Sequence, residues 1–481
     1  MYDKKILYQL IDNKYNDNKI DIYLNLIYHN YVNDANNYLL LISNALKYNY
    51  KKYNNIITKL SIYSYPQINN YFNDKLPNKN NIFNYFNLNN NLIDITINNH
   101  LIDDNNLKIL CSSLKNNNKL KILNLYDNTI TDITPLKDVL NNNTIKKIDL
   151  SYNNITDLTP LKYILKNNTN LKILNLYGNN IKDLTPLYYI LNNNKIQELY
   201  IDNPYCKYIH SSNNKIALHT ESDMYIPDRN LLFSVNKQQN VNNSNNYQYD
   251  LSNIFNILKN NNTLKKLDLR YFILNDLEYY GLCDMLKVNT SINSFTITNT
   301  INKSADFNHD CSELFNVLKY NNSIQELKIN IYKMNKKEVK SLSEMLKYNI
   351  SIKKLEIIVN NTSYNDLYLI YNSLEFNKKI EELFINNNKI PYNDIDKRYD
   401  LYLLCKCLYF NKSIKILEIY DYNITKNIDL LESLLKYNHH IKSMFLHELL
   451  YNNKNVIGIH DISFSTIYKF IKFNKILYND Y

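Results

Sequence analysis

The segment LKILNLYDN, which begins at Leu120, returns three times in slightly altered form. It becomes IKKIDLSYN from Ile145, LKILNLYGN from Leu171 and IQELYIDN from Ile196, so the starts lie 25, 26 and 25 residues apart. Each copy has apolar residues at positions one, four and six, and the first three have asparagine at position nine. A repeat of this length and spacing predicts a solenoid in which each coil adds one short, buried strand.

A second signature accompanies these segments and extends over most of the chain. Two apolar residues stand four positions apart, and asparagine follows three positions later. Such a pair forms one buried stripe on a short helix, and we expect the asparagine to end that helix in the left-handed conformation that glycine usually adopts. The signature occurs at Ile42/Leu46/Asn49, Ile82/Phe86/Asn89, Leu110/Leu114/Asn117, Leu136/Leu140/Asn143, Leu161/Leu165/Asn168, Leu187/Leu191/Asn194, Ile254/Leu258/Asn261, Leu282/Leu286/Asn289, Leu314/Leu318/Asn321, Leu342/Leu346/Asn349, Ile370/Leu374/Asn377, Leu404/Leu408/Asn411, Leu431/Leu435/Asn438 and Ile467/Ile471/Asn474.

These strand and helix signatures together resemble the leucine-rich repeat family. Coils with ITDITPL-type sequences resemble internalin repeats, and their Thr-Pro pairs at 134, 159 and 185 predict an N-cap threonine before a proline in the first helical turn. The later, more widely spaced coils resemble ribonuclease-inhibitor repeats, with strands that start at Leu264, Ile292, Ile324, Ile352, Ile380, Ile414 and Ile441. The resemblance implies an α/β leucine-rich-repeat solenoid, or horseshoe, of about thirteen coils, with a parallel concave β-sheet and short convex helices.

The repeat phase also predicts the domain organisation. Residues 1–37 lack it and are expected to form an N-terminal helical cap, while residues 38–450 form the solenoid, with early strands near 57–62 and from Leu92. A segment rich in asparagine and serine, about 204–250, is expected to be a polar insertion on one coil. Residues 451–481 are expected to form the C-terminal cap.

Composition narrows the function classes. The only three glycines among 481 residues are isolated, which excludes Gly-rich phosphate-binding loops and a GxSxG nucleophile elbow. Cys111, Cys283 and Cys405 share one helix position with aromatic residues elsewhere, so they are expected to pack in the core. His439, His440 and His447 lack zinc-ligand spacing. We therefore expect no catalysis, no cofactor and no metal.

The same composition bears on location and source. No long apolar run is present, the polar residues of the first segment are not expected to form a signal peptide, and six cysteines are not expected to form a disulfide scaffold. The sequence therefore predicts an intracellular, cytoplasmic protein without a membrane span. The abundance of asparagine, lysine, isoleucine and tyrosine indicates an AT-rich genome.

The concave sheet face carries the candidate binding residues. Because strand side chains alternate, positions five and seven of each strand should face away from the core, with position eight at the rim. Tyrosine beside Asp and Asn at these positions is typical of a surface that binds another protein, although tyrosine is common throughout this chain (46 residues). The predicted partner-binding residues are Tyr126, Asp149, Tyr152, Tyr177, Tyr200, Asp202, Arg270, Tyr271, Phe384, Tyr420 and Phe445.

Three other functions remain as alternatives to protein binding. Lysines recur at strand position two and would suit nucleic acid, but arginine is scarce, and carboxylates such as Asp149, Asp268 and Glu356 on the same face would repel a phosphate backbone. A regulator of a GTPase would need a polar side chain such as Arg270. A ubiquitin-ligase adaptor would need an F-box-like N-terminus, whose opening Leu-Pro and tryptophan are absent.

Overall fold

The computed structural model describes residues 19–24, 58–64, 86, 90–98, 102–193, 195–202, 251–270, 272, 274–298, 310–332, 334–360, 363–387, 394–421, 428–452 and 455–461. The chain divides into two compact units. The first comprises Met1–Tyr208 and Asn246–Ile257, and the second comprises Ile209–Asn245 and Leu258–Tyr481.

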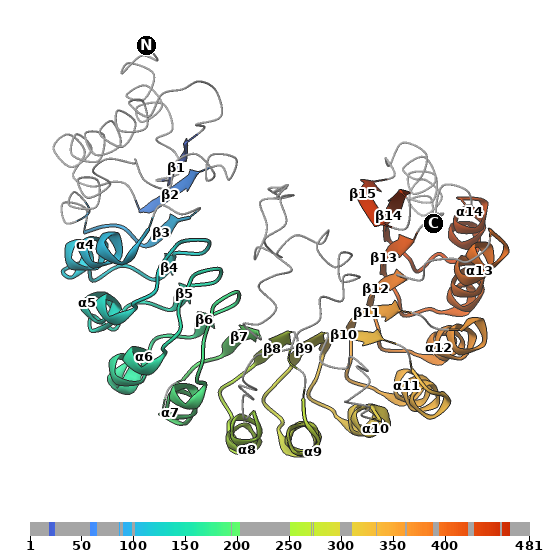
Figure 1. Ribbon diagram of the computed structural model, residues 1–481. Coiled ribbons are helices and arrows are strands. Elements are labelled where there is room, and N and C mark those ends of the chain that lie inside the picture. Colours follow the sequence, from blue (N-terminus) through green and yellow to red (C-terminus); the bar gives the residue numbers. More distant parts are fainter. Residues whose placement is uncertain are drawn as a thin grey trace, which may run out of the picture. The chain divides into compact units, whose positions relative to one another are not determined.

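The first unit contains a parallel sheet whose strands pair in chain order. They are β1 (Lys19–Leu24), β2 (Lys59–Ser64), β3 (Asp94–Ile97), β4 (Ile122–Asn124), β5 (Lys147–Asp149), β6 (Ile173–Asn175) and β7 (Glu198–Asp202). Its helices lie on one side of the sheet (Figure 1). They are α4 (Asp104–Leu114), η3 (Thr134–Leu136) with α5 (Lys137–Leu140), α6 (Thr159–Ile164) with η4 (Leu165–Asn167), and α7 (Thr185–Asn193).

The second unit repeats this plan with longer helices. Its parallel strands are β8 (Lys266–Arg270), β9 (Ser294–Thr298), β10 (Glu326–Tyr332), β11 (Lys354–Asn360), β12 (Glu382–Asn387), β13 (Ile416–Asp421) and β14 (Ser443–Asn452), and β15 (Asn455–Asp461) pairs with β14 in the antiparallel direction. The helices are α8 (Ser252–Asn260), in which the unit boundary falls, α9 (Asp276–Val288), α10 (Ser312–Tyr320), α11 (Lys336–Tyr348), α12 (Tyr364–Phe376), α13 (Asp394–Phe410) and α14 (Ile428–Tyr437).

The apolar repeat positions form the core, as the sequence predicts. Leu120, Leu123 and Leu125 are at most 1% exposed, and the same positions are buried in the later coils. Each observed strand from β3 to β14 begins two residues after the predicted start, so the strand phase is confirmed. Burying one such leucine stabilises the coil by about 1.5–3 kcal/mol.

Position nine explains why the short coils need asparagine. The Asn153 side chain donates to the carbonyls of Leu150 (3.0 Å) and Leu125 (2.9 Å), and its Oδ1 accepts from the N–H of Ile130 (3.0 Å). Asn128 and Asn179 make the equivalent bonds, and all three side chains are buried. One amide thus satisfies backbone groups of two neighbouring coils.

The helix-end asparagines adopt a conformation that the sequence analysis did not predict. Asn143 has the expected left-handed backbone (φ 54°), but Asn168, Asn289, Asn321, Asn349 and Asn377 are extended. Their buried side chains instead donate to a helix-end carbonyl of the preceding coil, as Asn349 does to Leu318 (2.7 Å). Each therefore caps the previous helix, whose last carbonyls have no partner within the helix.

Two further predictions about the ends of elements are wrong. Thr134, Thr159 and Thr185 are the first residues of their helices, and the side chains that accept their N–H groups belong to Asp132, Asp157 and Asp183, two residues earlier. Residues 19–24, expected within a helical cap, form strand β1 in register with β2. The predicted C-terminal helix at 467–474 and the 204–250 insertion lie outside the described residues.

Candidate functional site

The candidate site is the strand face, which we define as the sheet face opposite the helices. Parallel pairing aligns strand position five of successive coils in one row across each unit. In the first unit this row is Thr96, Asn124, Asp149, Asn175 and Tyr200. The Asn175 amide donates to Asp149 Oδ2 across the strands (2.9 Å), and Asp149 Oδ1 accepts from the Ser151 N–H (3.0 Å). The row is therefore an ordered polar surface.

Tyrosines flank this row, but they differ in exposure. Tyr126 and Tyr152 are half-buried, and Tyr152 has a left-handed backbone (φ 55°). Tyr177 and Tyr200 are each only 5% exposed and pack edge to face, with ring centroids 5.9 Å apart. The Tyr200 hydroxyl donates to Glu198 Oε2 (2.6 Å). Strand alternation assigns both rings to the predicted sheet face, but they have little exposed area for a partner to contact.

Asp202 and Gly178 fix the rim of the same unit. Both oxygens of the half-buried Asp202 accept from the Gly178 N–H at 2.9 Å. Gly178 has φ +65°, and a Cβ there would lie 2.7 Å from Tyr152 Cδ1. Only glycine fits both the backbone and the space beside the tyrosine.

The second unit has a longer row at position five, which changes from charged to aromatic along the sheet. Its residues are Asp268, Thr296, Lys328, Glu356, Phe384, Glu418 and Phe445. Lys328 and Glu356 form an ion pair on neighbouring strands. Burial lowers the pKa of Lys328, an effect that Glu356 opposes and Arg270 reinforces.

Arg270 is held by a neighbour on its own strand. Its Nε and Nη2 donate to the two carboxylate oxygens of Asp268 at 3.0 and 2.9 Å. Asp268 is 2% exposed, so this bidentate pair neutralises one of the carboxylates expected to repel nucleic acid. The same geometry weakens the arginine-based GTPase alternative, because Arg270 would have to leave Asp268 to act on a nucleotide.

Among the predicted site residues whose side chains the structure describes, the most exposed lies at the aromatic end of the row. Phe445 is 41% exposed on β14, and Phe384 on β12 is half-buried. Tyr420 lies on β13 in register with Asn386 and His447, but its side chain is outside the described residues, as is all of Tyr271.

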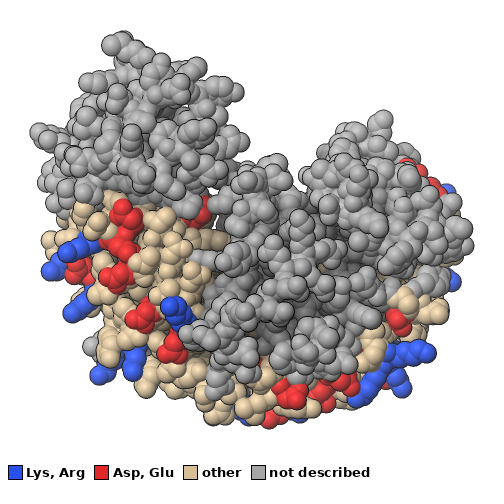
Figure 2. All heavy atoms as spheres, viewed as in Figure 1, with Lys and Arg blue, Asp and Glu red and all other residues tan. Residues whose placement is uncertain are grey.

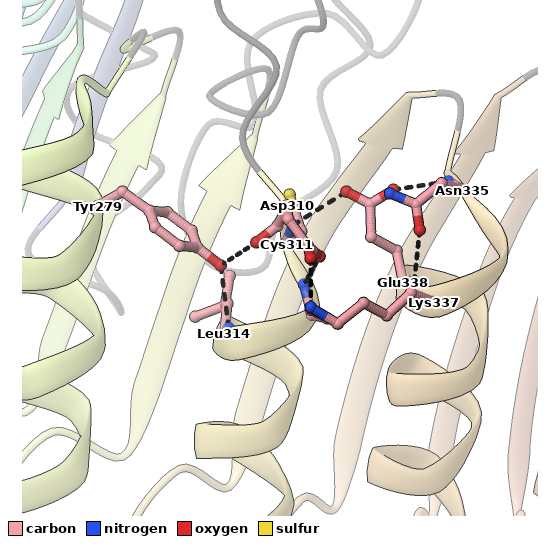
Figure 3. A network of polar contacts seen from close by, with 8 residues as sticks. Tyr279, Asp310, Cys311, Leu314, Asn335, Lys337 and Glu338 are labelled. Atoms are coloured by element: carbon pink, nitrogen blue, oxygen red, sulfur yellow. Dashed lines mark hydrogen bonds and ion pairs between the residues drawn. The ribbon is translucent and has the colours of Figure 1, made fainter.

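A polar network joins the N-terminal ends of α9, α10 and α11 (Figure 3). The Tyr279 hydroxyl donates to the Asp310 carbonyl (3.1 Å), and Glu338, which is 1% exposed, accepts from the N–H groups of Cys311 (2.9 Å) and Asn335 (2.6 Å). Burial acts to raise the pKa of Asp310, but hydrogen bonds from Lys337 and Ser312 outweigh it and lower the pKa to about 2. Every group has a structural partner, so the network ties coils together. Sequence reasoning missed it because its members come from three separate coils.

The cysteines and histidines singled out in the sequence differ in burial. Cys111, Cys283 and Cys405 are buried as predicted, and burial raises the pKa of the Cys283 and Cys405 thiols to about 12 each. His439 and His440 are exposed. Within the described ranges, no group of three or more His, Cys, Asp or Glu side chains is placed to hold a metal ion. No helix among those ranges is both long and apolar enough to cross a membrane.

Charge on the described surface is mixed. Figure 2 shows acidic and basic side chains side by side over both units, with a small group of basic side chains near α11 and α12. In this view the basic side chains of the described residues are not gathered on one face.

Comparison with known proteins gives one family match and a distant structural likeness. Residues 143–189 match the family described as Leucine Rich repeats (2 copies). The crystal structure of an internalin from Listeria monocytogenes is similar at 18% sequence identity, with a TM-score of 0.36 and 75% of each chain covered. The comparison with curated proteins gives no match. Residues 143–189 therefore match leucine-rich repeats, and they lie within an array of strand–helix coils that carries a ladder of position-nine asparagines.

Proposed function

We propose that the chain is a non-enzymatic scaffold that binds a partner protein through the strand face. The supporting observation is the position-five row of the second unit, in which two ion-paired strands lie beside Phe384, Glu418 and Phe445. Interfaces concentrate their binding energy in a few aromatic anchors, while fixed charges beside them select the partner.

The mechanism is rigid display. Each coil contacts its neighbours through buried leucines and asparagines, so the backbone holds the exposed side chains of the strand face in fixed positions. Partner binding then costs little ordering of the scaffold, which favours affinity.

The aromatic end of the row is the part to test. Phe445→Ala combined with Phe384→Ala should leave the circular dichroism spectrum unchanged and weaken partner binding at least about tenfold. Tyr163→Ala is the matched control, because Tyr163 is 68% exposed on α6. Immobilised wild type, double variant and control would each be incubated with an extract of the source cells, and captured proteins quantified by mass spectrometry.

Three outcomes are informative. A protein captured by wild type and control but lost from the double variant supports the proposal. Equal capture by all three would show that the aromatic end of the strand face does not bind it, and turnover of a small molecule by the purified chain would contradict the non-enzymatic role.

A further inference from the structure

Five successive helices of the second unit end in an exposed aromatic ring. In α10 to α14 the residue immediately before the helix-end asparagine is aromatic, and its side chain is about half exposed or more. These residues are Tyr320 (74%), Tyr348 (53%), Phe376 (48%), Phe410 (61%) and Tyr437 (50%). We call this row the aromatic ridge.

The ridge has a fixed geometry because of the residue that follows each ring. Asn321, Asn349, Asn377, Asn411 and Asn438 are buried and bound to the preceding coil, so the backbone beside each ring is anchored. The rings contribute little to the core, and Ile350, 64% exposed beside Tyr348, adds further apolar surface. Large exposed apolar side chains that recur at the same place on successive coils are typical of an interaction site.

Lysines alternate with the rings along part of the ridge. Lys319 Nζ lies 5.3 Å from the ring centroid of Tyr320 and 5.0 Å from that of Tyr348. Lys347 Nζ lies 5.3 Å from Tyr348 and 4.7 Å from Phe376, and Lys436 lies 5.4 Å from Tyr437. These are cation–π distances, so lysine side chains already occupy ring faces.

Lysines outnumber acidic side chains around the ridge. Glu344 and Glu381 are paired with Lys319 (2.9 Å) and Lys415 (2.7 Å), and a third acid, the half-buried Glu375, directly precedes Phe376. A larger set of exposed lysines on the same helix ends and the following turns makes no ion pair within the described residues: Lys347, Lys353, Lys378, Lys379, Lys412, Lys436 and Lys442.

We propose that the aromatic ridge binds an acidic segment of another protein that also carries aromatic or apolar side chains. Lysine ammonium groups, the positive edges of aromatic rings and tyrosine hydroxyl donors all favour carboxylates. Single-stranded nucleic acid is disfavoured, because its bases need open ring faces for stacking and a lysine lies over four of the five rings here. The ridge lies at helix ends, so it is a second surface beyond the strand face.

The test measures binding of the full chain to a fluorescein-labelled copolymer of glutamate and tyrosine by fluorescence anisotropy. The variant Tyr320→Ala/Tyr348→Ala/Phe376→Ala should bind at least about tenfold more weakly. Lys347→Gln/Lys436→Gln keeps the rings and should bind several-fold more weakly, with a smaller dependence on salt. Leu277→Ala/Tyr280→Ala is the matched control, because these residues are 69% and 59% exposed near the start of α9.

The proposal is overturned if wild type fails to bind the copolymer or if the ridge variant binds it as tightly as the control does. Tighter binding of an oligothymidylate, or of phosphatidylserine vesicles, that is lost in the ridge variant would also overturn it by assigning a different partner. The Phe384→Ala/Phe445→Ala variant should bind the copolymer normally, so failure of the strand-face proposal and failure of the ridge proposal are distinguishable.

Discussion

Asn349 shows how one side chain holds two coils together. Its Nδ2 donates to the carbonyls of Leu318 (2.7 Å) and Asn321 (3.1 Å), and its Oδ1 accepts from the N–H groups of Ser351 (2.9 Å) and Ile352 (2.8 Å). The side chain therefore completes the end of α10 and the start of β11 at once.

Asn349→Ala should lower the free energy of unfolding by roughly 2–4 kcal/mol, because it leaves several buried backbone groups without partners. Hydrogen exchange should show the loss concentrated around the ends of α10 and α11. Asn322→Ala, at an exposed position, is the control and should change stability by less than about 0.5 kcal/mol. Equal effects of the two substitutions would mean that the helix-end asparagines do not connect the coils.

A substitution at Gly178 tests the backbone conformation at the rim of the strand face. Gly178→Ala should destabilise the first unit by about 1–2 kcal/mol, because it places a Cβ at φ +65° and within 2.7 Å of Tyr152. Asp127, the equivalent residue one coil earlier than Tyr152, has φ 56°, so Asp127→Gly should cost little. Chemical denaturation compares the two, and a neutral Gly178→Ala would contradict the described conformation.

The lowered pKa of Asp310 predicts that the stability of the fold depends on pH. Its pKa is lowered to about 2 in the folded chain, against about 3.9 for an unperturbed aspartate. Its contribution to stability should be complete above pH 4 and lost as the pH falls from about 4 to about 2. Thermal unfolding of Asp310→Asn should show lower stability than wild type at pH 7, with a difference that shrinks towards pH 2. A difference that does not change with pH would exclude the Lys337 ion pair as its cause.

At the scale of elements, the sequence predicted the strands better than the conformation of the residues at the helix ends. The apolar residues at positions one, four and six determine which strand residues enter the core, and burial of Leu123 and Leu125 follows directly. Strand β1 escaped prediction because Asp17, at its position one, is charged, although Ile20 and Ile22 pair with Leu60 and Ile62.

The sequence predicted which sheet face carries the candidate residues, but not how exposed each side chain is. Alternation assigns Tyr177, Tyr200 and Ile358 to the strand face, yet their exposed fractions are 5%, 5% and 0%. Exposure depends on neighbouring coils and on pairs such as Tyr177 with Tyr200, and a single repeat does not encode these contacts. Likewise, each ridge ring directly precedes the helix-end asparagine of its coil, so the sequence alone did not distinguish the rings from the rest of the repeat.

A pair of neighbouring substitutions tests the strand phase. Leu174→Asp should unfold the coils around β6, because it buries a charge without a partner where the wild-type side chain is 0% exposed. Ile173→Asp, one residue earlier and half-buried on the opposite face, should cost far less. Circular dichroism and urea denaturation measure both effects, and a reversed order would mean that the strand phase is inverted.

At the scale of the molecule, the fold separates the core from two candidate contact surfaces. Leucines and asparagines hold the coils, while the strand face and the aromatic ridge carry exposed side chains such as Phe445 and Tyr320. The central claim is that equivalent positions of successive coils stand side by side on the strand face.

Thiol bridging tests that claim most directly. Glu356 and Phe384 are register partners on β11 and β12, so cysteines placed there should lie about 5 Å apart between their Cα atoms, whereas position 445 lies three strands from 356. The described native cysteines are buried, which limits their reaction. Glu356→Cys/Phe384→Cys treated with dibromobimane should give strong bridged fluorescence above the wild-type background, and Glu356→Cys/Phe445→Cys should give none. Bridging of the distant pair, or failure of the register pair, would contradict the stacked-coil account.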